Sequence, residues 1–306
     1  MPSKAKILKD LIYAPEIEIM PGVFDGFSAR LVEKSGFKSA GLSGAGLSES
    51  HLGWADIGLM GLEENLHASR TIAACCNIPL MADGDTGYGN AINVFHMVRA
   101  FEQAGIAGIM IEDQVWPKRC GHMKGKEVIS AEEMVEKVRA AADARRDPDF
   151  VIKSRTDSFA THGIKEVIRR LNMYAEAGAD LVFADALLAE EDIKTVVKNV
   201  PKPLSVNMGF GIRKRPTTPL ISAKRLQELG VAAVSYPRLL TSCAIQGMKN
   251  GLTVFLESLK KGETVDRPDL SVSFEEINEL MGLPEIQKME QRYLTKEQLK
   301  AKYDRK

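Results

Sequence analysis

The sequence predicts an α/β protein built as a (β/α)8 barrel of the TIM type, and three observations lead to this fold class. Short apolar runs alternate with amphipathic segments of helical length along most of the 306 residues. The apolar runs show little polar alternation, which is typical of strands buried on both faces of a parallel sheet. Eight strand–helix units can be counted, which is the number that closes such a barrel.

The predicted strands are the apolar runs, taken in chain order. They are Ile17–Pro21, Ser39–Ser43, Pro79–Asp83, Gly108–Glu112, Phe150–Ser154, Leu181–Asp185, Leu204–Met208 and Ala233–Pro237. Amphipathic helices are expected between them. The clearest is predicted over Ile164–Ala177, where apolar residues recur at helical spacing and form one stripe.

Four of the predicted helices end in a glycine that is followed, seven residues later, by the end of a strand. The glycines are Gly36, Gly105, Gly178 and Gly230, and each suits a left-handed helix cap. The seventh residues are Ser43, Glu112, Asp185 and Pro237. Because the C-terminal ends of barrel strands form the rim that houses active sites, we expect this repeat to deliver its seventh residues to that rim.

The chain beyond about residue 250 has a different pattern. Phe274–Leu283 and Pro284–Tyr293 are predicted to be short helices, and Ser273 begins a capping box with a glutamate three residues later. Helices added after a closed barrel need an apolar surface to pack against. We therefore expect a barrel over 1–250 and a helical extension over 251–306 that packs on a neighbouring subunit.

Composition argues against several classes of partner. The chain has 41 basic and 41 acidic residues with no long run of one sign, which argues against nucleic acid or an anionic membrane as the main partner. No apolar run reaches the roughly 18 residues of a membrane helix, and the N-terminus lacks an apolar signal core. The four cysteines do not suggest a disulfide framework, so a reduced, cytoplasmic setting is expected.

Acidic residues gather where two neighbouring predicted strands end. Asp83 and Asp85 follow one strand, Glu112 closes the next, and Asp56 lies in an earlier loop. Adjacent carboxylates repel one another at neutral pH, so this clustering indicates a bound cation. Oxygen-only donors suit magnesium, with manganese as the alternative metal. The competing interpretation, above all for Asp85, is an acid that merely caps a turn.

A cysteine and a histidine stand two residues apart in the long loop that follows this site. They are Cys120 and His122, within a loop predicted from about Gln114 to Ile129. Lys118, Arg119 and the histidine are expected to lower the pKa of the thiol, which would make Cys120 a proton donor or a nucleophile. Loops of this length beside an active-site rim are often lids.

Further residues at the predicted rim suit an acidic substrate. Arg155 can hold a carboxylate in a bidentate fork, although an internal ion pair with Asp157 or Asp185 is the alternative interpretation. The loop Ser43-Gly44-Ala45-Gly46 offers backbone N–H groups and a hydroxyl to an anion. Asn207 closes the seventh strand and can present its amide to a carboxylate oxygen.

At these motifs the chain resembles the isocitrate lyase/phosphoenolpyruvate mutase superfamily over nearly its whole length. The motifs are Pro21-Gly-Val-Phe-Asp25, Ser43-Gly-Ala45, Asp83-Gly-Asp-Thr-Gly-Tyr-Gly-Asn90, Ile111-Glu-Asp-Gln114, Lys118-Arg-Cys-Gly-His122 and Arg155-Thr-Asp157. The resemblance implies a (β/α)8 barrel whose terminal helix is exchanged between subunits, usually in a homotetramer arranged as a dimer of dimers. It also implies magnesium held by Asp83, with Asp56, Asp85 and Glu112 acting largely through water.

The resemblance further implies roles for the site residues. It implies that an α-keto or α-hydroxy acid binds at the metal, at Ser43-Gly44-Ala45 and at Arg155, with Gly121, Asp185 and Asn207 completing the substrate site. Cys120 would be the acid that protonates the enolate-like product of carbon–carbon cleavage, since the phosphonate mutases generally lack this cysteine. His122 and Glu112 would orient the loop and the waters of the metal.

The activity expected from this resemblance is retro-aldol cleavage of a di- or tricarboxylate such as 2,3-dimethylmalate or 2-methylisocitrate. Two departures favour a substrate with two carboxylates. Asp185 stands where the family often has glutamate, and Thr241–Ala244 occupies the region of an arginine that methylisocitrate lyases tend to carry, although Arg238 is near. The alternatives are an oxaloacetate hydrolase, a phosphonomutase of the carboxyphosphonoenolpyruvate or phosphonopyruvate type, and a non-catalytic barrel.

Overall fold

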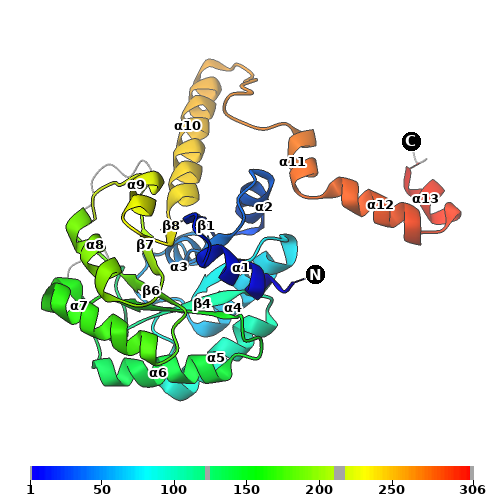
Figure 1. The fold of residues 1–306 in the computed structure, drawn as a ribbon. Helices are drawn as coiled ribbons and strands as arrows, with labels where there is room; N and C mark the ends of the chain where they lie inside the picture. The colour runs from blue at the N-terminus through cyan, green and yellow to red at the C-terminus, as the bar shows by residue number, and fades with distance from the viewer. Residues whose placement is uncertain (1, 121–124, 210–217, 304–306) are drawn as a thin grey trace. The chain divides into compact units, whose positions relative to one another are not determined.

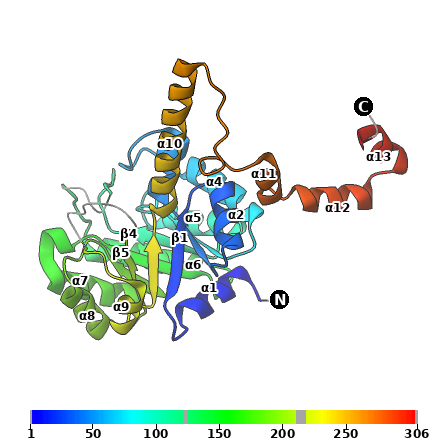
Figure 2. The same cartoon turned by 90° about the horizontal axis from the view of Figure 1, so that it is seen from above.

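Eight parallel strands form a closed barrel in the computed structural model, which describes residues 2–120, 125–209 and 218–303. The strands follow one another around the barrel in chain order, and β8 pairs with β1 to close it. Figure 2 shows the blue β1 beside the yellow β8. The strands are β1 (Glu18–Val23), β2 (Ala40–Leu42), β3 (Leu80–Asp83), β4 (Gly108–Glu112), β5 (Val151–Thr156), β6 (Leu181–Ala184), β7 (Leu204–Asn207) and β8 (Ala233–Tyr236).

The predicted fold class is confirmed, and the predicted strand ends lie within about two residues of the observed ones. Helices cover the outside of the barrel and connect its strands (Figure 1). The helices of the barrel unit are α1 (Lys4–Ile12), α2 (Gly26–Lys34), α3 (Gly44–Leu47), the π-helical turn η1 (Ser48–Leu52), α4 (Leu62–Cys75), α5 (Ala91–Gln103), α6 (Ala131–Ala144), α7 (Phe159–Glu176), α8 (Glu190–Asn199) and α9 (Ala223–Glu228).

The glycine repeat works as the sequence predicts. Gly36, Gly105, Gly178 and Gly230 have φ values of 88°, 87°, 115° and 89°, in the left-handed region that glycine adopts without steric cost. The helix predicted over Ile164–Ala177 forms the main part of α7. A short helical turn over Phe159–His162 precedes it, and the two parts meet at a kink at Gly163, where φ is 75°. These caps therefore set the point at which each strand begins.

The core beneath the barrel mouth is apolar. Leu8 and Ile12 of α1 belong to one buried cluster with residues of five strands and with Ala107, which directly precedes β4. The strand residues in this cluster are Met20, Met81, Val151, Leu181 and Ala233. This layer forms a solid base under the C-terminal end of the barrel, as expected of a barrel filled by side chains.

The chain divides into two compact units, Met1–Ser242 and Cys243–Lys306. This division falls within helix α10 (Leu239–Lys261). The boundary expected at residue 250 lies inside the same helix. The second unit also contains α11 (Phe274–Leu280), α12 (Leu283–Tyr293) and α13 (Lys296–Tyr303). No helix in the described part of the chain has the length and apolar character needed to span a bilayer.

The capping box predicted at the start of α11 is present. Glu276 N donates to Ser273 Oγ at 3.1 Å, and Ser273 N donates to Glu276 Oε2 at 2.8 Å. The exchange of helices between subunits, and the packing of the extension on a neighbour, remain predictions.

Candidate active site

A cavity of about 240 Å³ opens at the C-terminal ends of the strands, and most of the predicted site residues line it. The predicted residues in its wall are Ser43, Gly44, Ala45, Asp56, Asp83, Cys120, Arg155, Asp185 and Asn207. Asp85 and Glu112 are buried next to this wall through their ion pairs with Lys118 and Arg155. The predicted site residues Gly121 and His122 lie outside the described residues.

Lys118 reaches into the acid cluster. Its ammonium nitrogen lies 2.5 Å from Asp56 Oδ1 and 2.7 Å from Asp85 Oδ1, and the lysine is buried. Burial raises the pKa of Asp85 to about 7, with the charge of Lys118 opposing this shift. Burial also raises the pKa of Glu112, and there the opposing charge is Arg155. The four acids of the cluster, Asp56, Asp83, Asp85 and Glu112, therefore outnumber their two basic partners, Lys118 and Arg155.

The donor chemistry of this cluster fits a hard cation. Glu112 Oε1 is buried without a hydrogen-bond partner among the described residues, and Asp85 Oδ1 has only its ion pair with Lys118. Within the same residues, no three acidic, cysteine or histidine side chains are grouped closely enough to hold an ion directly. Lys118 forms an ion pair with Asp85, and Arg155 forms one with Glu112. An ion held mainly through water molecules suits this arrangement, and magnesium commonly binds in that way.

Asp83 is held close to the backbone of the predicted anion-binding loop. The backbone N–H of Asp85 donates to Asp83 Oδ1 at 3.0 Å. A Cβ atom at Gly44 would lie 2.5 Å from Asp83 Oδ2, so only glycine lets the loop approach the carboxylate this closely. Ser43 caps α3 by accepting a hydrogen bond from Gly46 N at 3.0 Å, which fixes the turn between β2 and α3.

Arg155 forms internal ion pairs with Asp157 and Asp185, which was the alternative interpretation of this residue. Its Nε and Nη2 donate to the two oxygens of Asp157 at 2.7 and 2.9 Å. Nη2 also donates to Asp185 Oδ2 at 3.0 Å, and Nη1 lies 3.2 Å from Glu112 Oε2. Burial acts to raise the pKa of Asp157, but Arg155 and Lys126 outweigh it and hold this pKa at about 2. Most donors of the guanidinium are therefore already engaged.

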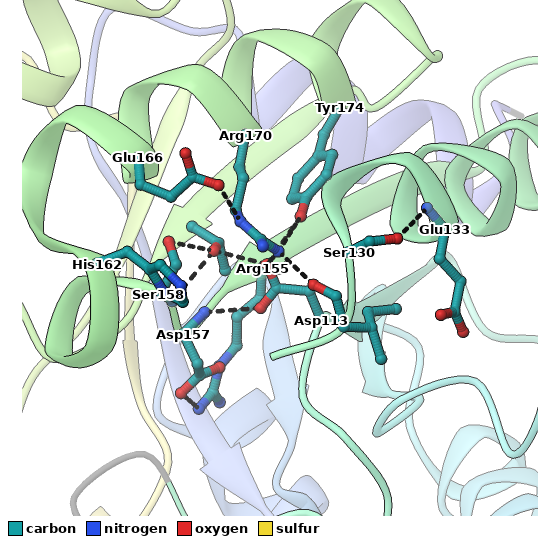
Figure 3. Close-up of polar contacts among 12 residues, drawn as sticks. Asp113, Ser130, Glu133, Arg155, Asp157, Ser158, His162, Glu166, Arg170 and Tyr174 are labelled. Carbon is teal, nitrogen blue, oxygen red and sulfur yellow. Dashed lines mark hydrogen bonds and ion pairs between the residues drawn. The ribbon is translucent and has the colours of Figure 1, made fainter. Parts of the chain in front are cut away.

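A buried network behind Arg155 fixes the ends of β4 and β5 (Figure 3). Its centre is the carboxylate of Asp113, which directly follows β4. This carboxylate accepts hydrogen bonds from Thr156 Oγ1 at 2.7 Å, Asp157 N at 2.9 Å, Arg170 Nη1 at 2.9 Å and Tyr174 OH at 2.7 Å. Because Arg170 and Tyr174 belong to α7, the network ties that helix to the strand end that carries Arg155.

Cys120 faces the cavity and is partly exposed. The basic group that contacts its thiol is Arg238, whose Nη1 lies 3.7 Å from Cys120 Sγ. Arg238 Nη2 donates to Glu49 at 2.6 Å, which orients the guanidinium. Lys118, which the sequence predicted to act on the thiol, binds Asp56 and Asp85 instead.

Four basic residues of the cavity wall were not among the predicted site residues: Lys118, Arg119, Lys153 and Arg238. The sequence held a signal for Lys153, because a lysine interrupts an otherwise apolar strand two residues before Arg155. Residues two apart on a strand face the same side, so Lys153 had to share the side of Arg155. The sequence also drew attention to Lys118 and Arg238, but only the folded chain brings Lys118 to Asp56 and Arg238 to Cys120.

Comparison with known proteins identifies the family. The family model described as phosphoenolpyruvate phosphomutase matches residues 8–256. The chain belongs to this family. The 2,3-dimethylmalate lyase of Eubacterium barkeri is 39% identical over 289 residues, covering 94% of this chain and 97% of that protein. The 2-methylisocitrate lyase of Aeropyrum pernix is 38% identical over 283 residues, covering 92% of this chain and 88% of that protein. These findings confirm the superfamily and the lyase branch that the motifs predicted.

Solved structures of the family share the fold. An oxaloacetate acetylhydrolase with 3,3-difluorooxalacetate has a TM-score of 0.87 at 30% identity, covering 94% of this chain and 96% of its own. A 2,3-dimethylmalate lyase has a TM-score of 0.86 at 31% identity, covering 95% and 96%. A phosphonopyruvate hydrolase with oxalate and magnesium has a TM-score of 0.84 at 29% identity, covering 96% and 100%. The family therefore includes hydrolases as well as lyases.

Proposed function

We propose that this protein is a magnesium-dependent carbon–carbon lyase. It cleaves a substituted malate, such as 2,3-dimethylmalate or 2-methylisocitrate, into an α-keto acid and a second carboxylate. The observation that carries this proposal is Cys120, which faces the same cavity as the acid cluster in a chain that is 39% identical to a 2,3-dimethylmalate lyase. A thiol at that position is the proton donor that a carbon–carbon cleavage requires.

The metal would be held by Asp83, with Asp56, Asp85 and Glu112 acting through water. The buried, unpartnered oxygen of Glu112 and the surplus of acids support this assignment. When bound, the ion supplies positive charge that stabilises negative charge developing on the 2-oxygen of the substrate. Magnesium is the expected ion, and manganese is the alternative that the same oxygen donors accept.

The remaining residues bind the substrate and move protons. The backbone N–H groups of Gly44 and Ala45 and the hydroxyl of Ser43, together with Arg155 and Asn207, hold the carboxylate next to the reacting oxygen, while Ser43 N donates to Val23 O at 3.0 Å within the barrel. Asp185 keeps Arg155 in place by accepting its Nη2 hydrogen bond. We also propose that Gly121 contributes to substrate binding, and that His122 works with Glu112 to orient the loop and the waters of the metal.

Cleavage begins when a carboxylate of the acid cluster takes the proton of the 2-hydroxyl group. The C2–C3 bond breaks, its electron pair moves to C3, and C2 becomes the carbonyl carbon of the α-keto acid. Cys120 Sγ donates its proton to C3, which gives the second carboxylate product. The resulting thiolate lies next to the guanidinium of Arg238, which stabilises its charge until a proton returns.

Replacement of the thiol tests this proton donor. Cys120→Ala should lower kcat for the cleaved malate by at least about 100-fold, the lower end of what a positioned acid contributes, because no other thiol lines the cavity among the described residues. Magnesium binding, followed by calorimetry, should remain. Cys243→Ala provides the control, since this cysteine is exposed and belongs to the second unit. Near-normal turnover by Cys120→Ala would remove the role of the thiol.

A substrate panel tests the reaction itself. We expect α-keto acid to form from dimethylmalate or methylisocitrate when magnesium is present, and not after its removal with a chelator. Oxaloacetate hydrolysis is the second candidate, because the structural likeness to an oxaloacetate acetylhydrolase is as strong as that to the lyase. Loss of oxaloacetate without cleavage of either malate would favour the hydrolase. Phosphonopyruvate, followed by phosphorus NMR, tests the phosphonomutase, against which Cys120 argues.

We also propose a homotetramer in a reducing, cytoplasmic compartment. The described cysteines are all free, which fits a reducing setting. The second unit exposes an unusual number of large apolar side chains, which supports burial against another subunit. Those on α10 are Ile245, Met248, Leu252, Phe255, Leu256 and Leu259.

A further inference from the structure

Lys153 places an amine in the lower part of the active-site cavity. It lies on β5 two residues before Arg155, so both side chains face the barrel interior, with Lys153 one layer deeper. Its neighbour in the barrel register is the apolar Met110, and the carboxylates of Asp83 and Asp185 lie near enough for their charges to act on the amine without forming an ion pair with it. Lys153 is 3% exposed, so bulk water solvates very little of it.

No acidic group of the described chain pairs with this amine. Its Nζ lies 4.7 Å from the centroid of the Phe183 ring, and it makes no hydrogen bond or ion pair with any described residue. The other basic groups placed deep in this site have carboxylate partners: Lys118 binds Asp56 and Asp85, Arg155 binds Asp157 and Asp185, and Arg238 binds Glu49. Lys153 therefore keeps its hydrogen-bond donors available.

An unpaired amine at this depth is unfavourable for the folded protein by itself. Desolvation disfavours its charged form and, with the charge of Arg155, lowers the pKa of Lys153 to about 7, although the nearby charges of Asp83 and Asp185 oppose this shift. An apolar side chain would pack against Met110 and Leu181, its neighbours in the barrel register, without this cost. A group that costs stability and points into a binding cavity is expected where a ligand supplies its missing partner.

We propose that Lys153 binds a carboxylate of the substrate in the lower part of the cavity, and that it thereby selects acids that carry a second carboxylate. This inference rests on the proposed function, since it names the group that distinguishes a malate from a simple 2-hydroxy acid. Arg155 is assigned to the carboxylate beside the reacting oxygen, and its ion pairs with Asp157, Asp185 and Glu112 leave it few donors for a second carboxylate. An anion beside Lys153 would also restore the charged form of its amine.

The test compares two ligands that differ in one group. Malate carries the second carboxylate, and 2-hydroxybutyrate has a methyl group in its place. Binding of both is measured by calorimetry with magnesium present, for the wild type and for Lys153→Met. We expect the substitution to weaken malate binding by roughly 10- to 100-fold, the range for a hydrogen bond to a charged group, and to change 2-hydroxybutyrate binding less than about twofold. Equal weakening of both ligands, or no change for malate, would overturn the assignment.

A second measurement separates ligand binding from a structural role. Methionine is close to lysine in length and matches the neighbouring methionines, so ligand-free Lys153→Met should melt at a temperature higher by roughly 2–4 °C. A lower melting temperature together with weaker binding of both ligands would show a structural role and refute the inference. Both measurements are independent of turnover. Selective malate binding without cleavage of any malate would refute the proposed lyase activity and leave the assignment of Lys153 intact.

Discussion

The charged side chains of the cavity are mostly arranged as compensated pairs. Arg155 is shared by Glu112, Asp157 and Asp185, and Lys118 by Asp56 and Asp85. Buried pairs of this kind contribute little net stability, because desolvation offsets their attraction, but they fix the geometry of the groups involved. A metal ion or an acidic substrate entering the cavity must therefore change the partners of these residues.

Lys153 differs from these pairs, and its proton gives a measurable pH dependence of stability. In the unfolded chain its pKa is near the ordinary value of 10.5, whereas in the folded protein it is about 7. Between these two values unfolding takes up a proton, so this group makes the free energy of unfolding rise with pH. The slope cannot exceed about 1.4 kcal/mol per pH unit. Below about pH 7 both states hold the proton, and the full cost of burying the charge is present.

Urea unfolding between pH 6.5 and 9.5 checks this expectation for the ligand-free protein. The wild type should gain stability with rising pH relative to Lys153→Met, and the difference between the two proteins should shrink toward pH 9.5. Lys194→Met, which removes an exposed lysine of α8, should follow the wild type. Parallel curves for the wild type and Lys153→Met would contradict the prediction.

At the scale of elements, the strand ends depend on the helices that follow them. The Asp113 carboxylate lies where β4 ends and receives hydrogen bonds from β5 and from α7 (Figure 3). Four donors on one buried carboxylate keep it satisfied without water. Helix α7 therefore acts on the active site by holding the strand end from which Arg155 extends.

Tyr174→Phe tests how much this network stabilises the fold. The substitution removes the hydroxyl that donates to Asp113 Oδ2 at 2.7 Å and leaves the ring in its buried place. We expect a loss of about 1–2 kcal/mol in the free energy of unfolding, because the carboxylate loses one of its buried donors. Tyr293→Phe is the matched control, since Tyr293 is 69% exposed and should change stability by less than about 0.5 kcal/mol. Equal effects of the two substitutions would show that the network contributes nothing.

At the scale of the whole molecule, the barrel unit buries its core, whereas the second unit does not. Within α11, α12 and α13 no described residue is buried. On α10, Leu252, Phe255, Leu256 and Leu259 are exposed at helical spacing and so share one face. An amphipathic helix with its apolar face in water is stable only when another surface covers that face.

Charges on this face of α10 should weaken assembly. We expect the wild type to form an oligomer, and Leu252→Glu combined with Phe255→Glu to shift it to smaller species, because buried carboxylates without partners are costly. Multi-angle light scattering after gel filtration measures the change. Asn250→Glu adds charge to the opposite side of the same helix and should assemble normally. An unchanged mass for the double variant would exclude this face from the interface.

The sequence by itself determined the barrel and the location of its active site. Apolar runs, glycine caps at Gly36, Gly105, Gly178 and Gly230, and acids at strand ends are local patterns, and each reports burial or backbone geometry within a few residues. The order of the strands followed from their number, because a parallel barrel of consecutive strand–helix units has one simple closure.

Only the tertiary structure decided which charges meet. Lys118 and Asp56 are far apart in the chain, as are Arg238 and Cys120, and closing the barrel brings each pair together. Whether Arg155 forms ion pairs with Glu112 and Asp185 or keeps its donors available for a ligand depends on side-chain geometry across three neighbouring strand ends. The missing partner of Lys153 was likewise invisible in the sequence, since a lysine in a strand does not reveal what lies across the cavity. Pairing of charges is a property of distances in space, and local sequence patterns do not encode those distances.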